Sequence, residues 1–285
     1  MPAALNLGRL TGKSDDARAG AGCIVFGHAN GFPAATYRVL FEAWQGAGWQ
    51  VLAPPLLGHD PRFAVSNNWP RLRDEMLDFI DRHAPGQRPV LVGHSMGGYV
   101  SLLAACKRPR LAQGVVLLDA PIFAGWRAHA VHALKLSGLM KRGGPGRVSA
   151  RRRQHWASGD EARAHFAAKR SFAVWDPRVL ADYIAGGMVP DPEQGALAVR
   201  LAFDRAVETR IYNTLPHHLA ALLRRHPPGC PVSYVGGTRS PEGRQAGLAA
   251  TRALVGERLS WVEGSHLLPM ERPAEAAAAV LRCLA

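Results

Sequence analysis

The sequence predicts one three-layer α/β domain with a mostly parallel sheet and a helical insertion. Short apolar segments bounded by glycine and proline alternate along the chain with longer segments of helical period. Strands this short and this uniformly apolar are typical of a parallel sheet that helices cover on both faces. The alternation stops only over residues 122–229, an interval too long to be a structureless loop. A chain of 285 residues can bury a large core without the help of disulfides or a structural metal.

The individual elements follow from this alternation. Apolar runs predict strands at Cys23–Phe26, Trp49–Ala53, Pro89–Val92, Val115–Leu118, Pro231–Val235 and Leu259–Val262. Helical period and boundary residues predict helices at Thr36–Gln45, Trp69–His83, Met96–Lys107, Gln245–Val255 and Pro273–Leu284. Leu5–Leu10 is the only candidate for an additional strand before these.

The interval 122–229 is expected to be an inserted subdomain of several amphipathic helices, with residues 1–121 and 230–285 forming the core. Tryptophan, phenylalanine, tyrosine and arginine recur in it, and no segment reads convincingly as a strand. Gly143–Gly146 is its one obvious flexible joint, because consecutive glycines leave the backbone unrestrained.

The cysteines indicate a reducing compartment. There are four, far apart and without a C-x-x-C pair, which argues against both a zinc site and a disulfide framework. Residues 1–22 lack the long apolar core of a signal peptide, and no apolar run reaches the roughly 18 residues that a membrane span needs. We therefore expect a cytoplasmic protein with no membrane partner.

The net charge of +13 is concentrated in the insertion. Residues 122–229 hold 17 lysines and arginines against 8 aspartates and glutamates, which is +9 of the total. Strong basicity is typical of nucleic-acid binding, but here the longest cluster is Arg151–Arg153 and no nucleic-acid-binding motif accompanies it. We expect no nucleic-acid partner. The charge indicates either solvated helix faces or the steering of an anionic small molecule.

A candidate nucleophile, Ser95, lies in the segment Gly93-His94-Ser95-Met96-Gly97-Gly98, which follows the third predicted strand and opens a helix. This is a G-x-S-x-G pattern in a strand–turn–helix context, where a strained turn exposes the serine hydroxyl. Small residues at 93 and 97 let neighbouring backbone come into contact. The helix begins at Met96, whose backbone N–H and the positive end of the helix dipole are placed to stabilise an oxyanion.

A serine nucleophile needs a base, and His266 lies where one is expected. It follows the last predicted strand and precedes the carboxyl-terminal helix, so it belongs to the same edge of the sheet as Ser95. The adjacent His217 and His218 in the insertion are weaker candidates for a site. Consecutive side chains on a helix diverge by about 100°, so these two are not expected to share a metal ion.

These segments resemble the α/β-hydrolase superfamily over nearly the whole chain. The resemblance is carried by the Ser95 turn, by Gly27–Pro33 (GHANGFP), by Pro55–His59 (PLLGH) and by Gly264–Pro273 (GSHLLPMERP). It implies an α/β-hydrolase fold in which residues 122–229 form a helical cap over the site. It also implies a second oxyanion donor, the backbone N–H of Asn30, beside that of Met96. Ala29 departs from the pattern, since the family usually has glycine there.

The acid of the implied triad is open between two carboxylates. The family usually carries it in a G-x-x-D sequence after the penultimate strand, but here residues 236–242 read GGTRSPE, and the nearest carboxylate is Glu242, two positions further on. A second placement is known in haloalkane dehalogenases: the end of the strand that follows the elbow helix, here the helix predicted at Met96–Lys107 after the Ser95 turn (the elbow). Asp119 lies there, after four apolar residues. We favour Asp119, because a buried carboxylate needs a partner such as the His266 imidazolium. Glu242 and a water-supported pair of Ser95 and His266 are the alternatives.

The resemblance implies a serine hydrolase that cleaves a small-molecule carboxylic ester through an acyl-enzyme, with no metal or organic cofactor. A serine at the elbow excludes the dehalogenase and epoxide hydrolase reactions, which in this superfamily use aspartate there. Alternatives on the same machinery are hydrolysis of a carbon–carbon bond, a thioester or a lactone. A catalytically silent hydrolase fold that binds a ligand is an alternative of another class. The oligomeric state is open.

Overall fold

A six-stranded, wholly parallel sheet lies at the centre of the computed structural model, which describes residues 22–142 and 144–284. Its order is β2-β1-β3-β4-β8-β9. The strands are β1 (Gly22–Gly27), β2 (Trp49–Leu52), β3 (Val90–His94), β4 (Gly114–Leu118), β8 (Val232–Gly237) and β9 (Leu259–Val262). Each predicted strand is thereby confirmed, whereas Leu5–Leu10 lies outside the described residues.

The core helices are η2 (Ala34–Tyr37), α1 (Arg38–Gly46), η3 (Pro61–Phe63), α2 (Pro70–His83), α3 (Met96–Lys107), α11 (Pro241–Ala246), α12 (Ala249–Val255), α13 (Leu268–Glu271) and α14 (Pro273–Leu284). The bounds predicted for α3 and α14 are confirmed. The single helix predicted over 245–255 is wrong, because Gly247 takes a φ of 69° and separates α11 from α12. The first predicted helix likewise begins as a 3-10 turn, η2, before α1.

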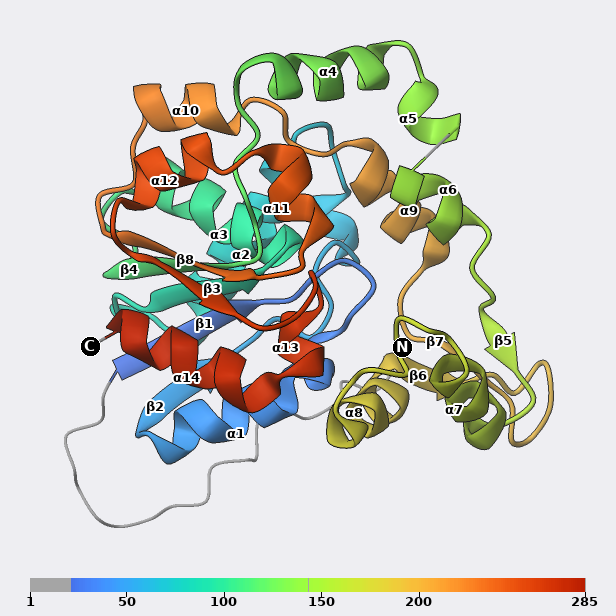
Figure 1. Ribbon diagram of the computed structural model, residues 1–285. Coiled ribbons are helices and arrows are strands. Elements are labelled where there is room, and N and C mark those ends of the chain that lie inside the picture. The colour runs from blue at the N-terminus through green and yellow to red at the C-terminus, as the bar shows by residue number, and fades with distance from the viewer. Residues whose placement is uncertain (1–21, 143, 285) are drawn as a thin grey trace.

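Helices cover both faces of the sheet, with α1 and α14 below it and α3 and α12 above it in Figure 1. This layering explains why the strands are apolar throughout. In β1, Ile24 and Phe26 pack into the core on the side of α1 and α14, while Cys23 and Val25 pack into the core under α2 and α3. Burying both sets removes apolar surface from water, worth about 1.5–3 kcal/mol for each large aliphatic or aromatic side chain.

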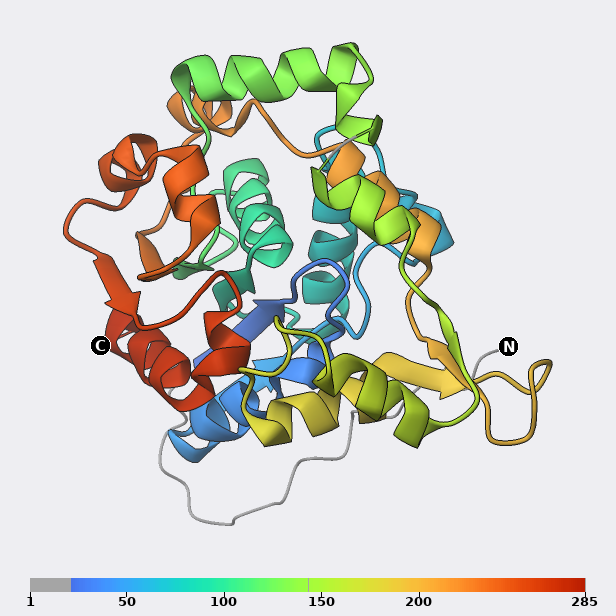
Figure 2. The same cartoon turned by 45° about the vertical axis from the view of Figure 1, so that its right-hand side comes forward.

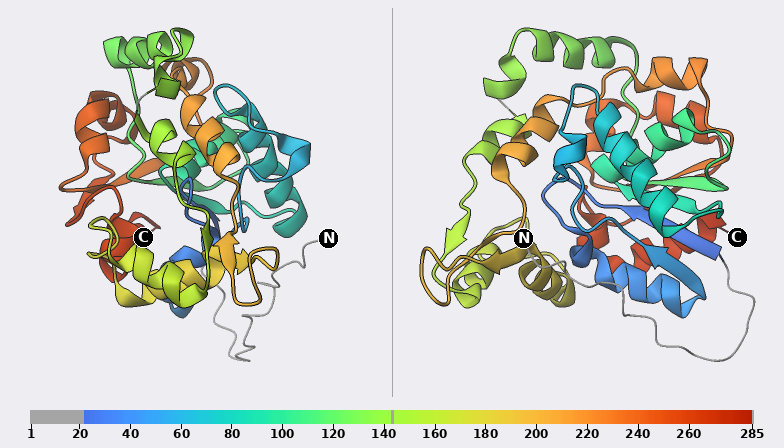
Figure 3. Two further views of the ribbon diagram at one scale, coloured as in Figure 1. Left: turned by 90° about the vertical axis from the view of Figure 1, so that its right-hand side faces the viewer. Right: turned by 180° about the vertical axis from the view of Figure 1, so that it is seen from behind.

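Residues 122–229 run between β4 and β8 and lie across the top and down the right-hand side of the molecule in Figure 1; Figure 2 shows the same segment after a turn of 45°. Their helices are α4 (Gly125–Leu136), α5 (Leu139–Arg142), α6 (Gly144–Ala150), α7 (Gly159–Ala167), α8 (Pro177–Gly187), α9 (Arg205–Asn213) and α10 (Leu219–Arg225). Figure 3 shows from two further sides that α4 (green) lies at the top of the molecule and the pair α7 and α8 (olive) at the bottom. Among the described residues, no helix combines the length and the apolar character needed to cross a membrane.

Two expectations for this segment are wrong. It contains a small antiparallel sheet of order β5-β7-β6, formed by β5 (His155–Trp156), β6 (Met188–Pro190) and β7 (Val199–Leu201). Strands of two or three residues are too short to give a recognisable period, which is why the sequence does not predict them. Of the flexible joint expected at 143–146, residues 144–146 form the first turn of α6, whereas Gly143 lies outside the described residues.

Candidate active site

Ser95 lies on a strained turn between β3 and α3. Its φ of 51° and ψ of −113° are far from the regions that side-chain-bearing residues prefer, and such strain collects at functional sites. Glycines make the turn possible. A Cβ on Gly97 would lie 1.9 Å from the carbonyl oxygen of Gly27, and one on Gly93 would lie 2.3 Å from the backbone of Gly97. The elbow helix therefore packs directly against β1, and the serine side chain is held out at the carboxyl edge of the sheet.

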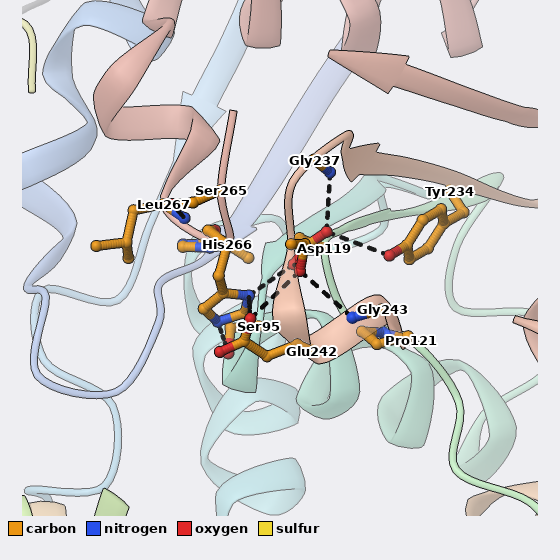
Figure 4. Close-up of polar contacts among 12 residues, drawn as sticks. Ser95, Asp119, Pro121, Tyr234, Gly237, Glu242, Gly243, Ser265, His266 and Leu267 are labelled. Carbon is orange, nitrogen blue, oxygen red and sulfur yellow. Dashed lines mark hydrogen bonds and ion pairs between the residues drawn. The ribbon is translucent and has the colours of Figure 1, made fainter. Parts of the chain in front are cut away.

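Three side chains from three strand ends form a continuous hydrogen-bonded chain (Figure 4). The Ser95 hydroxyl lies 2.9 Å from Nε2 of His266, and Nδ1 of the same ring lies 2.7 Å from Oδ2 of Asp119. A carboxylate only accepts, so Nδ1 carries the proton and Nε2 is free to accept from the serine. Ser95 follows β3, Asp119 follows β4, and His266 follows β9.

Asp119 is fully buried, and three further donors hold it. Its oxygens accept hydrogen bonds from the Ser240 hydroxyl at 2.5 Å, from the backbone N–H of Gly237 at 2.9 Å and from the Tyr234 hydroxyl at 3.3 Å. Burial alone raises the pKa of Asp119, but the bonds to His266, Ser240 and Gly237 outweigh it, so the pKa lies below its ordinary value. The carboxylate is thus kept ionised inside the protein.

Glu242 is close to the same imidazole but differently placed. Its Oε2 lies 3.7 Å from Nδ1 of His266, beyond hydrogen-bond distance, and its side chain is 40% exposed where that of Asp119 is 0% exposed. Burial lowers the pKa of His266, but the hydrogen bond to Asp119 and the charges of Glu242 and Asp119 outweigh it and raise the pKa above its ordinary value. Both carboxylates therefore favour the protonated ring.

The two expected oxyanion donors lie on segments that flank Ser95. Met96 opens α3, and Asn30 lies in the loop after β1. Within the described residues, neither backbone N–H donates to a backbone carbonyl. The Asn30 side chain donates to the carbonyl of Glu208 in α9 at 3.0 Å, which ties this loop to the insertion. Both N–H groups can therefore serve as donors to a bound oxygen.

His28, in the same loop, is buried, and both nitrogens of its ring are hydrogen-bonded to backbone groups. Its Nε2 accepts from the backbone N–H of Leu57 at 2.7 Å, and its Nδ1 donates to the carbonyl of Ala29 at 2.9 Å. Burial lowers the pKa of His28 to about 4, so the ring is neutral. It joins the loop after β1 to the turn that follows β2.

Ser240 is a residue of this site that the sequence does not single out. Counted from Gly237, it stands where a G-x-x-D sequence would place its aspartate, and it donates to Asp119 instead. The available signal was its place before Pro241, since serine followed by proline is typical of a helix start. In the structure, Ser240 is the N-cap of α11, and its hydroxyl accepts from the Gly243 N–H at 3.3 Å.

Asp119, Glu242 and His266 bring potential metal-ligand atoms within 4.8 Å of one another. A cation bound there would need the Nδ1 lone pair of His266, but that nitrogen carries the proton donated to Asp119. The donor set therefore suits a hydrogen-bonded triad better than a metal. Within 22–142 and 144–284, no group of three metal-ligating side chains includes His217 or His218.

A cavity of about 770 Å³ lies beside the loop that carries His266. Ser265 and Leu267, the neighbours of His266, line it from the core. Its basic side chains are Lys169 and Arg170 from the insertion and Arg239 from the loop after β8. Glu271 also lines the cavity, and its Oε2 lies 3.6 Å from Nη2 of Arg239. Three basic side chains thus line the cavity together with one acidic side chain.

Comparison with known proteins agrees with this architecture. Residues 24–280 match the family described as the alpha/beta hydrolase family. The chain is 32% identical over 107 residues to a monoglyceride lipase of Mus musculus, and this match spans 35% of either protein. It thus covers about a third of the length of that relative.

Two solved structures share the fold. An E-2-(acetamidomethylene)succinate hydrolase superposes with a TM-score of 0.74 and 22% identity, covering 93% of this chain and 92% of the other. The thioesterase domain from the curacin biosynthetic pathway gives a TM-score of 0.67 and 20% identity, covering 91% and 90%. The family match extends from β1 into α14 and so includes nearly every described element. The chain therefore belongs to the alpha/beta hydrolase family.

Proposed function

We propose that this hydrolase is a serine esterase that cleaves a carboxylic ester through an acyl-enzyme. The observation that carries the proposal is the hydrogen-bonded chain from Ser95 through His266 to Asp119, which begins at a strained, glycine-packed turn. Nucleophile, base and acid in this order convert a weakly nucleophilic hydroxyl into a reactive one. The acid in this proposal is Asp119, because of the two candidate carboxylates only Asp119 is within hydrogen-bond distance of Nδ1.

The reaction follows from the proton positions. His266 accepts the Ser95 proton at Nε2 as the serine oxygen attacks the ester carbonyl, and Asp119 stabilises the imidazolium that forms. The backbone N–H groups of Met96 and Asn30 donate to the negative oxygen of the tetrahedral intermediate. His266 then protonates the leaving alcohol. In the second half, His266 takes a proton from water as the oxygen of that water attacks the acyl carbonyl. The bond from the acyl carbon to the Ser95 oxygen then breaks, the carboxylic acid leaves, and His266 returns the proton to Ser95.

Two considerations favour an ester over the other bonds that this machinery can cleave. The relative from Mus musculus, 32% identical over 107 residues, is a monoglyceride lipase, which by its name acts on an ester. The thioesterase resemblance rests on 20% identity and concerns the fold. A catalytically silent protein is disfavoured, because the hydrogen-bonded chain of Ser95, His266 and Asp119 is intact.

We further propose that residues 122–229 act as a cap and that the substrate carries a negative charge. The cap holds nine of the thirteen net positive charges, and Lys169, Arg170 and Arg239 line the cavity beside His266. Such an arrangement attracts an anion and can pair with it. The cytoplasmic location and the absence of a nucleic-acid partner stay predictions from the sequence.

The proposal is tested by covalent labelling. A fluorophosphonate should label the wild-type protein at Ser95 and abolish hydrolysis of p-nitrophenyl butyrate, whereas Ser95→Ala should show neither labelling nor turnover. Circular dichroism should show that this variant is folded, because the exchange removes only one oxygen. Labelling at another residue, or turnover that survives in Ser95→Ala, would contradict the assignment.

A further inference from the structure

A buried histidine beside the nucleophile is not used by the proposed reaction. His94 is the last residue of β3, directly precedes Ser95 and is 0% exposed. Its Nδ1 lies 2.7 Å from the Tyr37 hydroxyl, and its Nε2 lies 2.8 Å from the backbone carbonyl of His266. The Tyr37 hydroxyl is also 3.1 Å from the backbone N–H of Ala29. Nε2 thus bonds to the segment that carries His266, and Nδ1 is linked through the Tyr37 hydroxyl to the segment that carries Asn30.

The direction of each bond is fixed by its ends. The carbonyl of His266 can only accept, so Nε2 of His94 carries a proton and donates it. A neutral ring then has a bare Nδ1, which accepts from the Tyr37 hydroxyl. The Tyr37 oxygen in turn accepts from the Ala29 N–H. The result is a relay from Ala29 through Tyr37 and His94 to the His266 carbonyl.

The environment keeps this relay in one protonation state. Burial lowers the pKa of His94 to about 3, so the ring is neutral throughout the neutral pH range. Burial also raises the pKa of Tyr37 far above its usual value, so its hydroxyl keeps its proton. These four groups, the Ala29 N–H, the Tyr37 hydroxyl, the His94 ring and the His266 carbonyl, therefore keep one fixed set of hydrogen bonds and do not exchange protons with the reaction. We call this set the brace.

We propose that Tyr37 and His94 are positioning residues that hold two loops at a fixed separation across Ser95. These are the oxyanion loop, residues 28–33 after β1, and the His266 loop, residues 263–267 after β9. Ala29 directly precedes Asn30, so the bond to Tyr37 fixes the peptide next to the proposed oxyanion donor. The bond from His94 fixes the backbone of His266, while Asp119 fixes its ring. The inference rests on the proposed function, because a brace between these loops matters only if both act on one reacting group.

The brace contributes through geometry. The loops that it joins are far apart in the chain, and a misplacement of about 1 Å in a catalytic group can cost about a hundredfold in rate. The stabilisation of an oxyanion depends equally on where its donors point. Loss of the brace should thus lower kcat more than it weakens substrate binding.

Tyr37→Phe is the first test. The variant keeps the ring that packs 4.6 Å from Phe26, centroid to centroid, and removes only the hydroxyl that joins Ala29 to His94. With p-nitrophenyl butyrate we expect kcat to fall about 10- to 100-fold and KM to change less than about threefold. The acid limb of the pH profile should not move, because Tyr37 does not contact the His266 ring.

Thr251→Val is the matched control. Thr251 is buried, and its hydroxyl accepts the backbone N–H of Ile122 at 2.9 Å, so the variant also loses a buried hydroxyl that satisfies an amide. We expect its kcat to stay within about twofold of wild type once both variants are corrected for the folded fraction. If Tyr37→Phe has the kcat of Thr251→Val, the brace is wrong.

A measurement on the wild-type protein stands independently of any variant. Nitrogen-15 spectra of histidine-labelled protein should show His94 as the neutral ring protonated at Nε2, unchanged between about pH 5 and pH 9. A ring protonated at Nδ1, or one that titrates in this range, would refute the relay. If instead the wild type neither labels with fluorophosphonate nor hydrolyses esters, the proposed function fails while the relay can still be observed.

Discussion

Asp119 and Glu242 present the same imidazole with two carboxylates, and only one makes a hydrogen bond to it. Asp119 directly follows β4 and has a φ of 43°, a backbone conformation that aspartate tolerates better than most residues. The strained backbone is thus found at the carboxylate that accepts the hydrogen bond from Nδ1 of His266. Glu242, at the start of α11, contributes its charge from 3.7 Å.

We therefore predict that the two carboxylates differ sharply in a substitution test. Asp119→Asn should lower kcat/KM by about 10⁴, because the ring loses both its fixed orientation and its counter-charge. Glu242→Gln should lower kcat/KM less than about tenfold, because Asp119 still orients the ring. Steady-state kinetics on the two isosteric variants decides the question, and the opposite ranking would assign the acid to Glu242.

The pH profile gives a second prediction at this scale. A base must be neutral to act, and the pKa of His266 is raised, so kcat/KM should fall as the pH drops through a value above the ordinary pKa of a histidine. In Glu242→Gln the nearby negative charge is gone, which lowers the pKa of His266 and moves this limb to lower pH. A limb that stays in place would show that Glu242 has no electrostatic effect on the ring.

At the level of elements, α3 packs directly against β1, because Gly97 and Gly27 place no side chain between them. We predict that Gly97→Ala destabilises the protein by about 3 kcal/mol or more, since its Cβ would lie 1.9 Å from the Gly27 carbonyl oxygen. Gly46→Ala in α1 is the control: nothing lies within 4 Å of its Cβ, and alanine suits a helix better than glycine. Urea denaturation should separate the two variants, and equal midpoints would refute the close approach.

Elements with a strong local pattern could be predicted from the sequence. The parallel strands are apolar on both faces, and α3 and α14 have clear boundaries, so each is found where the pattern indicates. The sheet β5-β7-β6 could not be predicted, because its pairing is decided by tertiary contacts between strands of two or three residues. The break at Gly247 depends on a positive φ, which the presence of a glycine allows but does not require.

The site was partly predictable for the same reason. Ser95 and His266 each follow an apolar strand, so sheet topology alone brings them to one edge. The choice between Asp119 and Glu242 needed distances, because both candidates fall on that edge. Ser240, Tyr37 and His94 could not be assigned from the sequence, since their contacts join segments distant in the chain.

At the scale of the whole molecule, core and insertion are joined next to the site. Asn30 donates its side-chain amide to the carbonyl of Glu208, and the Glu208 carboxylate, fully buried in α9, pairs with Arg152 at 2.9 Å. A Cβ on Gly31 would lie 2.8 Å from that carboxylate, so the ion pair packs directly on the loop after β1. The loop after β1 is thus held by Tyr37 from the core and by Glu208 from the insertion.

The distribution of charge leads to the last prediction. If the insertion acts as the proposed basic cap, it should steer an anionic substrate toward the site. We therefore expect kcat/KM for a p-nitrophenyl hemiester of a dicarboxylic acid to fall about tenfold when ionic strength rises from about 0.01 M to 0.5 M. The value for a neutral p-nitrophenyl ester should change little. Arg170→Glu, at the cavity beside His266, should reduce the salt dependence. Lys107→Glu makes the same charge change at the end of α3 remote from Ser95 and should not. If hemiester and neutral ester respond equally to salt, the cap's charge belongs to solvated helix faces and plays no part in substrate capture.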